Sequence, residues 1–411
     1  MGGLVGEDIL LARAYLSRVA EPACVAVWDC VQRHGPVAAA HLIREGRGAG
    51  ELSAATMARR EHADPQADLD AAHRHGIRLV VPESDEWPHF AMAALERTGQ
   101  ARAARFAAGE CTLAESGEPI PPLALWVKGV GDLASVGVRS VGIVGSRAST
   151  AYGEHVTADL GFGLAGRDVT VVSGGAYGID AAAHRSALAA GGQTVLVSAG
   201  GLDRPYPSGN AALFTEVADT GLVISESPPG AAPQRHRFLT RNRLIAALST
   251  GTVVVEAARR SGAANTAGHC TTLGRPVMAV PGPVTSPMSA GCHDLLRREH
   301  SPALLVTCVD DVLAVVGVMG EGIRLGSREQ VERVGTDLRA ELDGLDPVAR
   351  RVFEGLPVRR AARPDEIAQR CGVSPIEVMR SLPVLDLAGL LDASDAGYRI
   401  AARLRTRREA V

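Results

Sequence analysis

The sequence predicts an α/β protein: a Rossmann-like, doubly wound, mostly parallel sheet, with a small helical domain before it and a winged-helix domain after it. Two observations lead to this prediction. Between residues 121 and 317, short runs rich in valine and isoleucine alternate with helical stretches, and runs that are apolar on both faces are typical of a parallel sheet covered on both sides. The length of 411 residues also exceeds one ordinary core and favours two or three domains.

The first region, residues 1–76, is predicted to be a small helical domain of the SAM or helix-hairpin-helix type. Its apolar residues recur at spacings of three and four, and Pro and Gly separate the segments "EDILLARAYLSRV", "CVAVWDCVQRH" and "PVAAAHLIREG". Residues 77–120 are irregular, include an acidic, Gly-containing stretch, and are predicted to be a linker.

The sheet region, residues 121–317, contains seven predicted strands: "SVGIVG", "VTVVSG", "TVLVSAG", "LVISES", "TVVVEA", "PVMAVPG" and "ALLVTC". Helical stretches separate them, among them "GEHVTADLGFGLAG", "DAAAHRSALAAG" and "TRNRLIAALST". In such a sheet, ligands bind at the carboxyl ends of the strands. The loops that follow the strands are therefore the place to look for function.

After a charged, Gly-containing linker at 318–345, residues 346–403 have the outline of a winged helix-turn-helix: two helices around a Cys-Gly-Val-Ser turn, then two short extended pieces. The second helix of that turn offers Glu377, Arg380 and Asp386 to solvent. This is a poor basic surface for a DNA groove, so a protein-contact or tethering role is favoured at least equally. The basic tail, 404–411, is either a solvated end or an electrostatic aid to DNA binding.

Composition excludes several classes of function. Lys128 is the only lysine and is followed by Gly129 and Val130, so a P-loop NTPase is excluded. The start lacks a secretory signal and no apolar run is long enough to cross a bilayer, so we expect a cytoplasmic protein with no membrane partner. Seven scattered cysteines indicate reduced thiols. The pairs His269–Cys270 and Cys292–His293 match no standard zinc spacing, and no metal is expected.

Two glycine-rich loops follow the first two strands of the sheet region. Glycine allows several backbone N–H groups to converge on one anion, and a following helix N-terminus favours negative charge. Hydroxyl groups and a bidentate guanidinium add further phosphate donors. The predicted phosphate-binding residues of these loops are Gly145, Ser146, Arg147, Ser173, Gly174, Gly175, Ala176 and Gly178.

A dinucleotide cofactor is disfavoured at these loops. The glycines at 174, 175 and 178 do not have the spacing of G-x-G-x-x-G, and Asp168 lies at the wrong end of its strand to hold a ribose. No cofactor is therefore expected. No catalytic set emerges either: Asp180 is predicted to cap its helix or to pin the loop.

A cluster of basic residues follows the fourth strand. A charge run is usually a solvated face, but beside Arg147 and two glycine loops it favours a polyanion groove, in spite of the net charge of -3. Phe238 and Tyr177 are candidates for stacking on bases. The residues of this cluster predicted to bind phosphate are Arg241, Asn242 and Arg243.

In their order along the chain, these motifs resemble those of the DNA-processing protein A (DprA, also called Smf) family. The matching segments are Gly145–Arg147, Ser173–Asp180 with Ala183–His184, Tyr206–Pro207, Ser225–Glu226, Arg241–Arg243, Val254–Ala257 and Pro281–Gly282. The resemblance covers the whole sheet region. Two departures are Leu239, where the family commonly has proline, and Asn265, where an apolar residue is usual.

The resemblance implies a non-enzymatic protein that binds single-stranded DNA without sequence preference, protects it, and helps to load the RecA recombinase, notably during natural transformation in competent cells. It also implies a homodimer formed through the Rossmann-like domain. Carried over by motif, Arg147, Ser146 and the loop amides hold backbone phosphate, and Arg241 and Asn242 line the same pocket.

Two alternatives stay open at this point. One is a nucleotide-cleaving phosphoribohydrolase that uses the glycine loops. The stretch "STGTVVVEAARRSGAANTA" lacks the Pro-Gly-Gly and the following helical acid that such an enzyme needs. The other is an adaptor whose nucleic-acid site is vestigial, which the retained arginines oppose.

Overall fold

The computed structural model describes residues 5–48, 50–108, 119–259, 261–300, 302–317, 345–358, 360–394 and 397–401. The chain divides into two compact units, residues 1–319 and 320–411. Residues 318–344 of the predicted linker at 318–345 and the basic tail at 404–411 lie outside the described residues. Among the helices in the described ranges, none is both long and apolar enough to cross a membrane.

The first unit is built on a nine-stranded sheet in the order β1-β2-β6-β5-β4-β3-β7-β8-β9. Neighbours from β6 to β9 run parallel, whereas β1 and β2 pair antiparallel with each other and β2 pairs antiparallel with β6. The strands are β1 (Ile77–Val80), β2 (Leu125–Lys128), β3 (Ser140–Val144), β4 (Thr170–Ser173), β5 (Thr194–Val197), β6 (Leu222–Ser225), β7 (Gly251–Val254), β8 (Val277–Ala279) and β9 (Leu304–Leu305). The predicted doubly wound, mostly parallel sheet is thus confirmed, with all seven predicted strands present.

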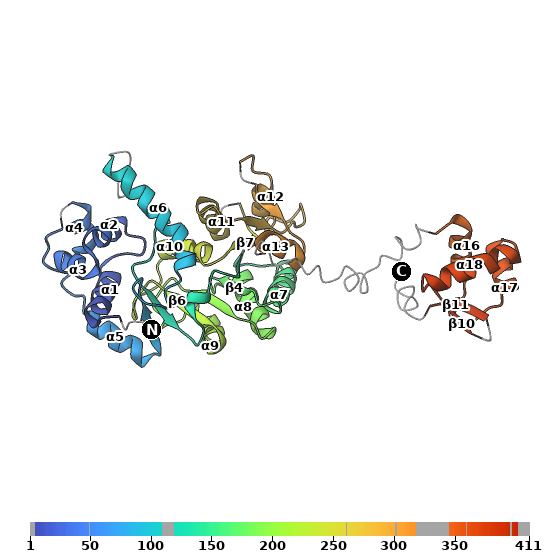
Figure 1. Ribbon diagram of the computed structural model, residues 1–411, viewed down its shortest axis with the longest axis horizontal. Coiled ribbons are helices and arrows are strands. Elements are labelled where there is room, and N and C mark those ends of the chain that lie inside the picture. Colours follow the sequence, from blue (N-terminus) through green and yellow to red (C-terminus); the bar gives the residue numbers. More distant parts are fainter. Residues whose placement is uncertain are drawn as a thin grey trace. The chain divides into compact units, whose positions relative to one another are not determined.

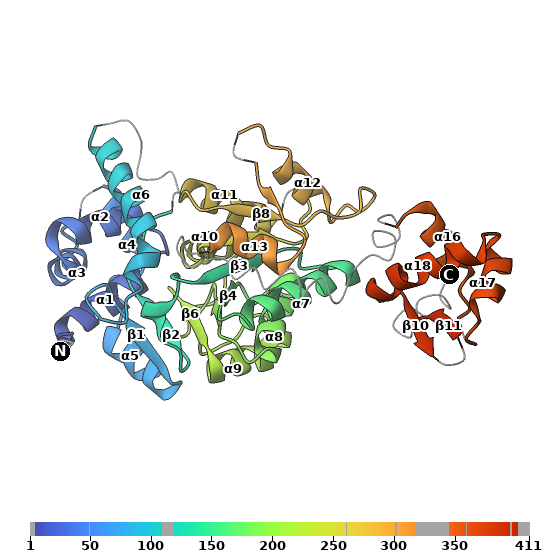
Figure 2. The same ribbon diagram turned by 45° about the vertical axis from the view of Figure 1, so that its right-hand side comes forward.

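Helices cover both faces of the sheet, because its strands are apolar on both sides. Val141 and Ile143 of β3 pack into one core with α7, α8 and α13, while Val144 packs into the opposite core with α6, α10, α11 and α12. Figures 1 and 2 show α7, α8 and α9 grouped on one side and α10 and α11 on the other. The helices are α6 (His89–Ala107), α7 (Ala151–Ala165), α8 (Ile179–Ala189), α9 (Ala211–Thr220), α10 (Arg235–Ala247), α11 (Gly262–Thr272), α12 (Ala290–Leu296) and α13 (Val309–Val316).

The predicted N-terminal helices are present, but they share a core with the sheet. Ala14 and Ala72 pack in one cluster with Leu196 of β5 and Val217 of α9, so this region belongs to the same compact unit as the sheet. Its likeness to a SAM or helix-hairpin-helix domain stays a prediction. The helices are α1 (Glu7–Val19), α2 (Val25–His34), α3 (Pro36–Arg44), α4 (Glu51–Thr56) and α5 (Pro65–Arg74).

The segment at 77–120 differs from the predicted linker. Its first residues form strand β1 at the edge of the sheet, and α6 buries Met92 and Leu95 in the core beside α10. The irregular appearance of the sequence arises because β1 has only four residues and the Pro- and Ser-rich turn around Trp87 follows it directly. This segment therefore extends the sheet domain.

In its described residues, the second unit contains three helices and an antiparallel hairpin, the elements predicted for a winged helix. Its core includes Val352, Ile367, Val378 and Ile400. Glu377, Arg380 and Asp386 are exposed, as expected. The elements are α16 (Pro347–Gly355), α17 (Pro364–Cys371), α18 (Pro375–Leu387), β10 (Leu391–Ser394) and β11 (Gly397–Ile400).

Candidate functional site

The strand order reverses its direction at β3, because β4 pairs on one side of it and β7 on the other. Loops leaving the carboxyl ends of β3 and β7 diverge at such a point, where doubly wound proteins bind their ligands. Here Glu256, which follows β7, fills this position: it is 2% exposed and accepts hydrogen bonds from the Thr150 N–H at 2.9 Å and from the Thr150 hydroxyl at 2.7 Å. Glu256 thereby helps to fix the start of α7.

The loop after β3 presents one charged side chain to solvent. Arg147 is exposed, while Gly145 and Ser146 are half-buried beneath it. The Ser146 hydroxyl oxygen accepts a hydrogen bond from the Ala148 N–H at 3.1 Å, which tightens the turn. Of the predicted residues in this loop, Arg147 is the one placed to meet a ligand first.

The loop after β4 is folded around an anion of its own. The Asp180 carboxylate accepts hydrogen bonds from the Ala176 N–H, at 3.4 Å, and from the Gly174 N–H. Burial raises the pKa of Asp180, and the nearby Arg241 opposes that rise. The prediction that Asp180 pins the loop is confirmed. The amides of Gly174 and Ala176, predicted to meet phosphate, are directed at this carboxylate instead.

The two loops are packed directly against each other. Gly178 has a φ of +75° and any Cβ there would collide with the carbonyl oxygens of Ser146 and Arg147. The Ile179 N–H, at the start of α8, donates to the Ser146 carbonyl at 3.2 Å. Glycine is therefore required at 178 by both conformation and space. The position of Arg147 depends on the second loop.

Arg241 of α10 fixes the second loop to the sheet. Its Nη1 donates to the Gly174 carbonyl at 2.6 Å and to the Val197 carbonyl at the end of β5. Its side chain is buried, and this burial lowers the pKa of Arg241 to about 10, against the opposing influence of Asp180. A buried guanidinium held by backbone carbonyls positions the loop and does not face solvent.

Three other predicted residues also turn inward. Ser173 donates its hydroxyl to the Ile143 carbonyl at 2.6 Å and is fully buried. Arg243 is 1% exposed and forms a bidentate ion pair with Glu226 at 2.6 and 2.7 Å. Asn242 donates to the Asn265 amide oxygen at 3.0 Å. The departure at Asn265 thus supplies a partner for Asn242, and all three predicted ligand groups are used within the fold.

An aromatic pair adjoins Arg147. The Arg147 guanidinium lies 5.1 Å from the centre of the Phe238 ring, a cation–π contact, and Phe238 lies 5.7 Å from Tyr206 at an interplanar angle of 54°. Tyr206 and Tyr177 are each about half exposed. Arg147, Phe238 and Tyr206 form a surface with one cation and two ring faces, hereafter the Arg147 surface.

Sequence reasoning singled out each member of this surface: Arg147 as a phosphate ligand, Phe238 as a candidate for stacking on bases, and Tyr206 in the Tyr-Pro motif. The structure brings Phe238 to both Arg147 and Tyr206. Tyr177 lies against Gly209 instead.

The basic run at the start of α10 is largely neutralised from the N-terminal helices. Glu21 accepts hydrogen bonds from Arg237 at 2.7 and 2.8 Å, from His236 at 3.0 Å, and from Arg59. Burial would raise the pKa of Glu21, but the hydrogen bonds from these three partners hold it well below its usual range. Glu21 had no sequence signal, since its partners His236 and Arg237 lie more than 200 residues away in the chain.

The cysteine and histidine pairs considered for zinc have structural contacts. Burial raises the pKa of Cys270 to about 11 and that of Cys292 to about 12, and both thiols contact protein oxygens. Within the described ranges, no three His, Cys, Asp or Glu side chains gather as metal ligands.

Comparison with known proteins adds a separate line of observation. A family model described as DNA recombination-mediator protein A matches residues 111–317. A protein named DNA processing protein DprA in Mycobacterium tuberculosis is 50% identical over 389 residues, 95% of this chain and 94% of that protein. Protein Smf of Escherichia coli is 34% identical over 284 residues, 67% of this chain and 71% of that protein. The X-ray structure of DNA processing protein A from Streptococcus pneumoniae has a TM-score of 0.59 and 28% identity, covering 77% of this chain and 100% of that one.

Proposed function

The chain belongs to the DNA recombination-mediator protein A family, and from that premise we propose that it binds single-stranded DNA without sequence preference, protects it, and helps to load the RecA recombinase, as in natural transformation. It acts by binding, without catalysing a reaction. It works in the cytoplasm as a homodimer formed through the sheet domain.

The observation that carries this proposal is the Arg147 surface. An exposed guanidinium suits a backbone phosphate, and an aromatic ring face suits any base. Neither group reads the hydrogen-bonding edge of a base, so binding through them is independent of sequence. One strand can engage both groups, because the phosphate and the base of a nucleotide are close neighbours.

The buried residues of the site act by positioning. Arg241 holds the second loop, and Gly178 of that loop supports the backbone under Arg147. Arg241, Asn242 and Arg243 are accordingly not proposed to contact phosphate directly. We assign the direct contacts with the strand to Arg147, the Ser146 hydroxyl, and the rings of Phe238 and Tyr206.

The test is fluorescence anisotropy of a labelled oligo-dT over a salt series, with the native protein and Arg147→Ala. The native protein should bind with an affinity that falls steeply as salt rises. Loss of one phosphate contact should weaken binding and reduce the slope of log K against log salt by about 0.7–1.

The matched control is Arg185→Ala, which removes an exposed arginine on α8 of the same unit. It should leave both the affinity and the slope unchanged. If native binding is absent, or if both variants behave alike, the Arg147 surface is not a strand-binding site. Hydrolysis of nucleoside monophosphates would then be the reaction to assay.

A further inference from the structure

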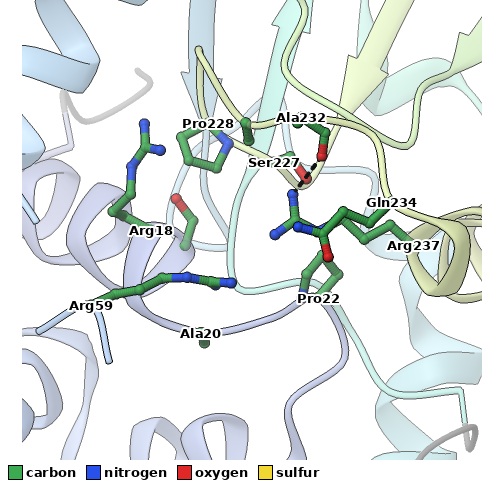
Figure 3. A pocket seen from close by; sticks show the side chains of 11 residues that line it. Arg18, Ala20, Pro22, Arg59, Ser227, Pro228, Ala232, Gln234 and Arg237 are labelled. Atoms are coloured by element: carbon green, nitrogen blue, oxygen red, sulfur yellow. Dashed lines mark hydrogen bonds between the residues drawn. The ribbon is translucent and has the colours of Figure 1, made fainter. Parts of the chain in front are cut away.

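A polar pocket lies between the N-terminal helices and the sheet, in a region that the proposed function does not use. Its volume is about 210 Å³. Figure 3 shows Arg59 and Arg237 extending toward each other from opposite sides, while the Arg18 side chain runs upward on the side of Pro228. The lining residues are Ser17, Arg18, Ala20, Pro22, Arg59, Ser227, Pro228, Ala231, Ala232, Gln234 and Arg237.

The charge of this lining is one-sided. It contains three arginines and, among the described residues that form it, no acid. The carboxylates that pair with these arginines, Glu21 and Asp68, lie outside the lining. Glu21 Oε1 bridges Arg59 and Arg237, and Asp68 pairs with Arg18, so three guanidinium groups share two carboxylates and the cluster keeps a net positive charge.

Several guanidinium N–H groups of these arginines have no hydrogen-bond acceptor in the described residues. Arg18 employs Nε and Nη2, to Asp68 and to the Pro229 carbonyl, and Arg59 employs Nη2 to Glu21. In the part of the chain that the structure describes, Nη1 of Arg18 and both Nε and Nη1 of Arg59 donate no hydrogen bond. Each guanidinium carries five N–H donors, so these groups can still bind oxygen atoms.

The rest of the lining mixes apolar and polar groups. Ala20, Pro22, Pro228 and Ala231 supply apolar surface, Ser17 and Ser227 supply hydroxyl groups, and Gln234 offers a side-chain amide that does not cap α10. A bare inorganic ion would leave the apolar groups without contact. A ligand with an anionic head and a compact organic part contacts both the arginines and these apolar groups.

We propose that this pocket binds a phosphate monoester of nucleotide size or smaller, with its phosphate held by Arg18, Arg59 and Arg237. A phosphomonoester carries a charge of about −1.5 to −2 and three free oxygens, and guanidinium groups bind such oxygens in bidentate fashion. The phosphate has two sources: a free mononucleotide, or the terminal phosphate of a DNA strand. Arg237 immediately precedes Phe238 of the Arg147 surface, so a strand end is within the same neighbourhood of α10.

The first measurement is isothermal titration of the full-length protein with dTMP, with thymidine as the ligand that lacks phosphate. Three variants are compared with the native protein. Arg59→Ala removes donors, Gln234→Glu adds a negative charge to the lining while leaving every arginine pair intact, and Arg33→Ala removes an exposed arginine of α2 outside the pocket. Thermal unfolding checks that each variant is folded.

We expect dTMP to bind and thymidine not to bind. Arg59→Ala removes a charge-assisted hydrogen bond and Gln234→Glu adds a charge that repels phosphate, so each should weaken dTMP binding by about 10-fold to 100-fold, with no change in Arg33→Ala. Arg147→Ala should bind dTMP as the native protein does. Binding of dTMP at the pocket is therefore tested independently of strand binding at the Arg147 surface.

The second arm compares oligo-dT bearing a 5′-phosphate, a 3′-phosphate or neither. Tighter binding of one phosphorylated form, abolished by Gln234→Glu, assigns the pocket to strand ends. Binding of dTMP without such a preference assigns it to a free mononucleotide. If the native protein neither binds dTMP nor distinguishes the three oligonucleotides, the pocket is only a packing gap behind three ion pairs and the proposal is wrong.

Discussion

The two glycine-rich loops look alike in sequence and differ in what they do. The loop after β3 leaves Arg147 exposed, with its guanidinium against Phe238. The loop after β4 has its amides directed at Asp180 and its Gly174 carbonyl bound by the buried Arg241. One loop presents a charge, and the other is internally satisfied and supports it.

The difference shows that a glycine-rich turn after a strand does not by itself create an anion site. Its amides bind whichever anion is nearest, and in the second loop that anion is part of the same chain. What decides the function of each loop is the burial of the charge beside it. Three experiments can break or sharpen this contrast.

The largest effect is expected from removing the charge that holds the second loop. Arg241→Ala leaves the carbonyls of Gly174 and Val197 without their donor, each at a cost of about 1–3 kcal/mol. The free energy of unfolding should therefore fall by about 3–5 kcal/mol. Arg147→Ala should change it by no more than about 0.5 kcal/mol, since Arg147 is exposed. Urea unfolding of both variants measures the difference, and equal losses would refute the contrast.

A smaller effect concerns His184 on α8, the helix that follows the second loop. Burial, reinforced by Arg241, lowers the pKa of His184 to about 3 from 6.5. Below pH 6.5 His184 gains a proton in the unfolded chain and not in the folded chain. Its contribution to the free energy of unfolding is therefore fully present above pH 6.5 and is lost as the pH falls toward 3. For one proton the loss is about 1.4 kcal/mol per pH unit.

His184→Gln can still hydrogen-bond to Thr194 but cannot titrate. Its stability should therefore fall less steeply with pH than that of the native protein, by the amount due to this one proton. His269, whose pKa burial lowers to about 4, titrates in both proteins and cancels in the comparison. Parallel curves between pH 6.5 and 5 would show that His184 is protonated in the folded protein.

The smallest effect is expected at the first loop. Arg147→Lys keeps the charge and gives up the flat contact with Phe238, which is worth about 0.5–1 kcal/mol at an exposed site. Affinity for oligo-dT should fall about two- to fivefold while the salt slope stays unchanged. A slope reduced as much as in Arg147→Ala would mean that the phosphate requires the guanidinium fork.

Much of the fold could be predicted from the sequence, because its signals are local. The Val- and Ile-rich runs at β3 and β7 have few polar residues and are buried at every position, which only a sheet covered on both faces tolerates. Strands β1 and β2 were not among the predicted strands. Strand β1 lies at the edge of the sheet with Arg78 and Leu79 only half-buried, so it lacks the continuous buried run of the parallel strands. Its pairing with β2 depends on residues almost fifty positions away.

The site was predicted less well, because burial is not local. Arg147 and Arg243 are identical residues in motif positions, yet one is exposed and the other lies against Glu226 with 1% exposure. Each outcome follows from the partner that the fold supplies, and Glu226 is seventeen residues from Arg243 on another element. The sequence therefore located the region of the site and could not say which of its arginines face outward.

The carboxylate of Glu256 has a wider consequence for how a ligand can approach. In other doubly wound sheets the crevice where the strand order reverses encloses a cofactor, and its walls limit the size of what enters. Here Glu256 caps α7 from inside that crevice and packs tightly against Gly153. The proposed strand-binding surface around the exposed Arg147 lies outside that crevice, and a surface open to solvent lets a long polymer lie across it without threading an end.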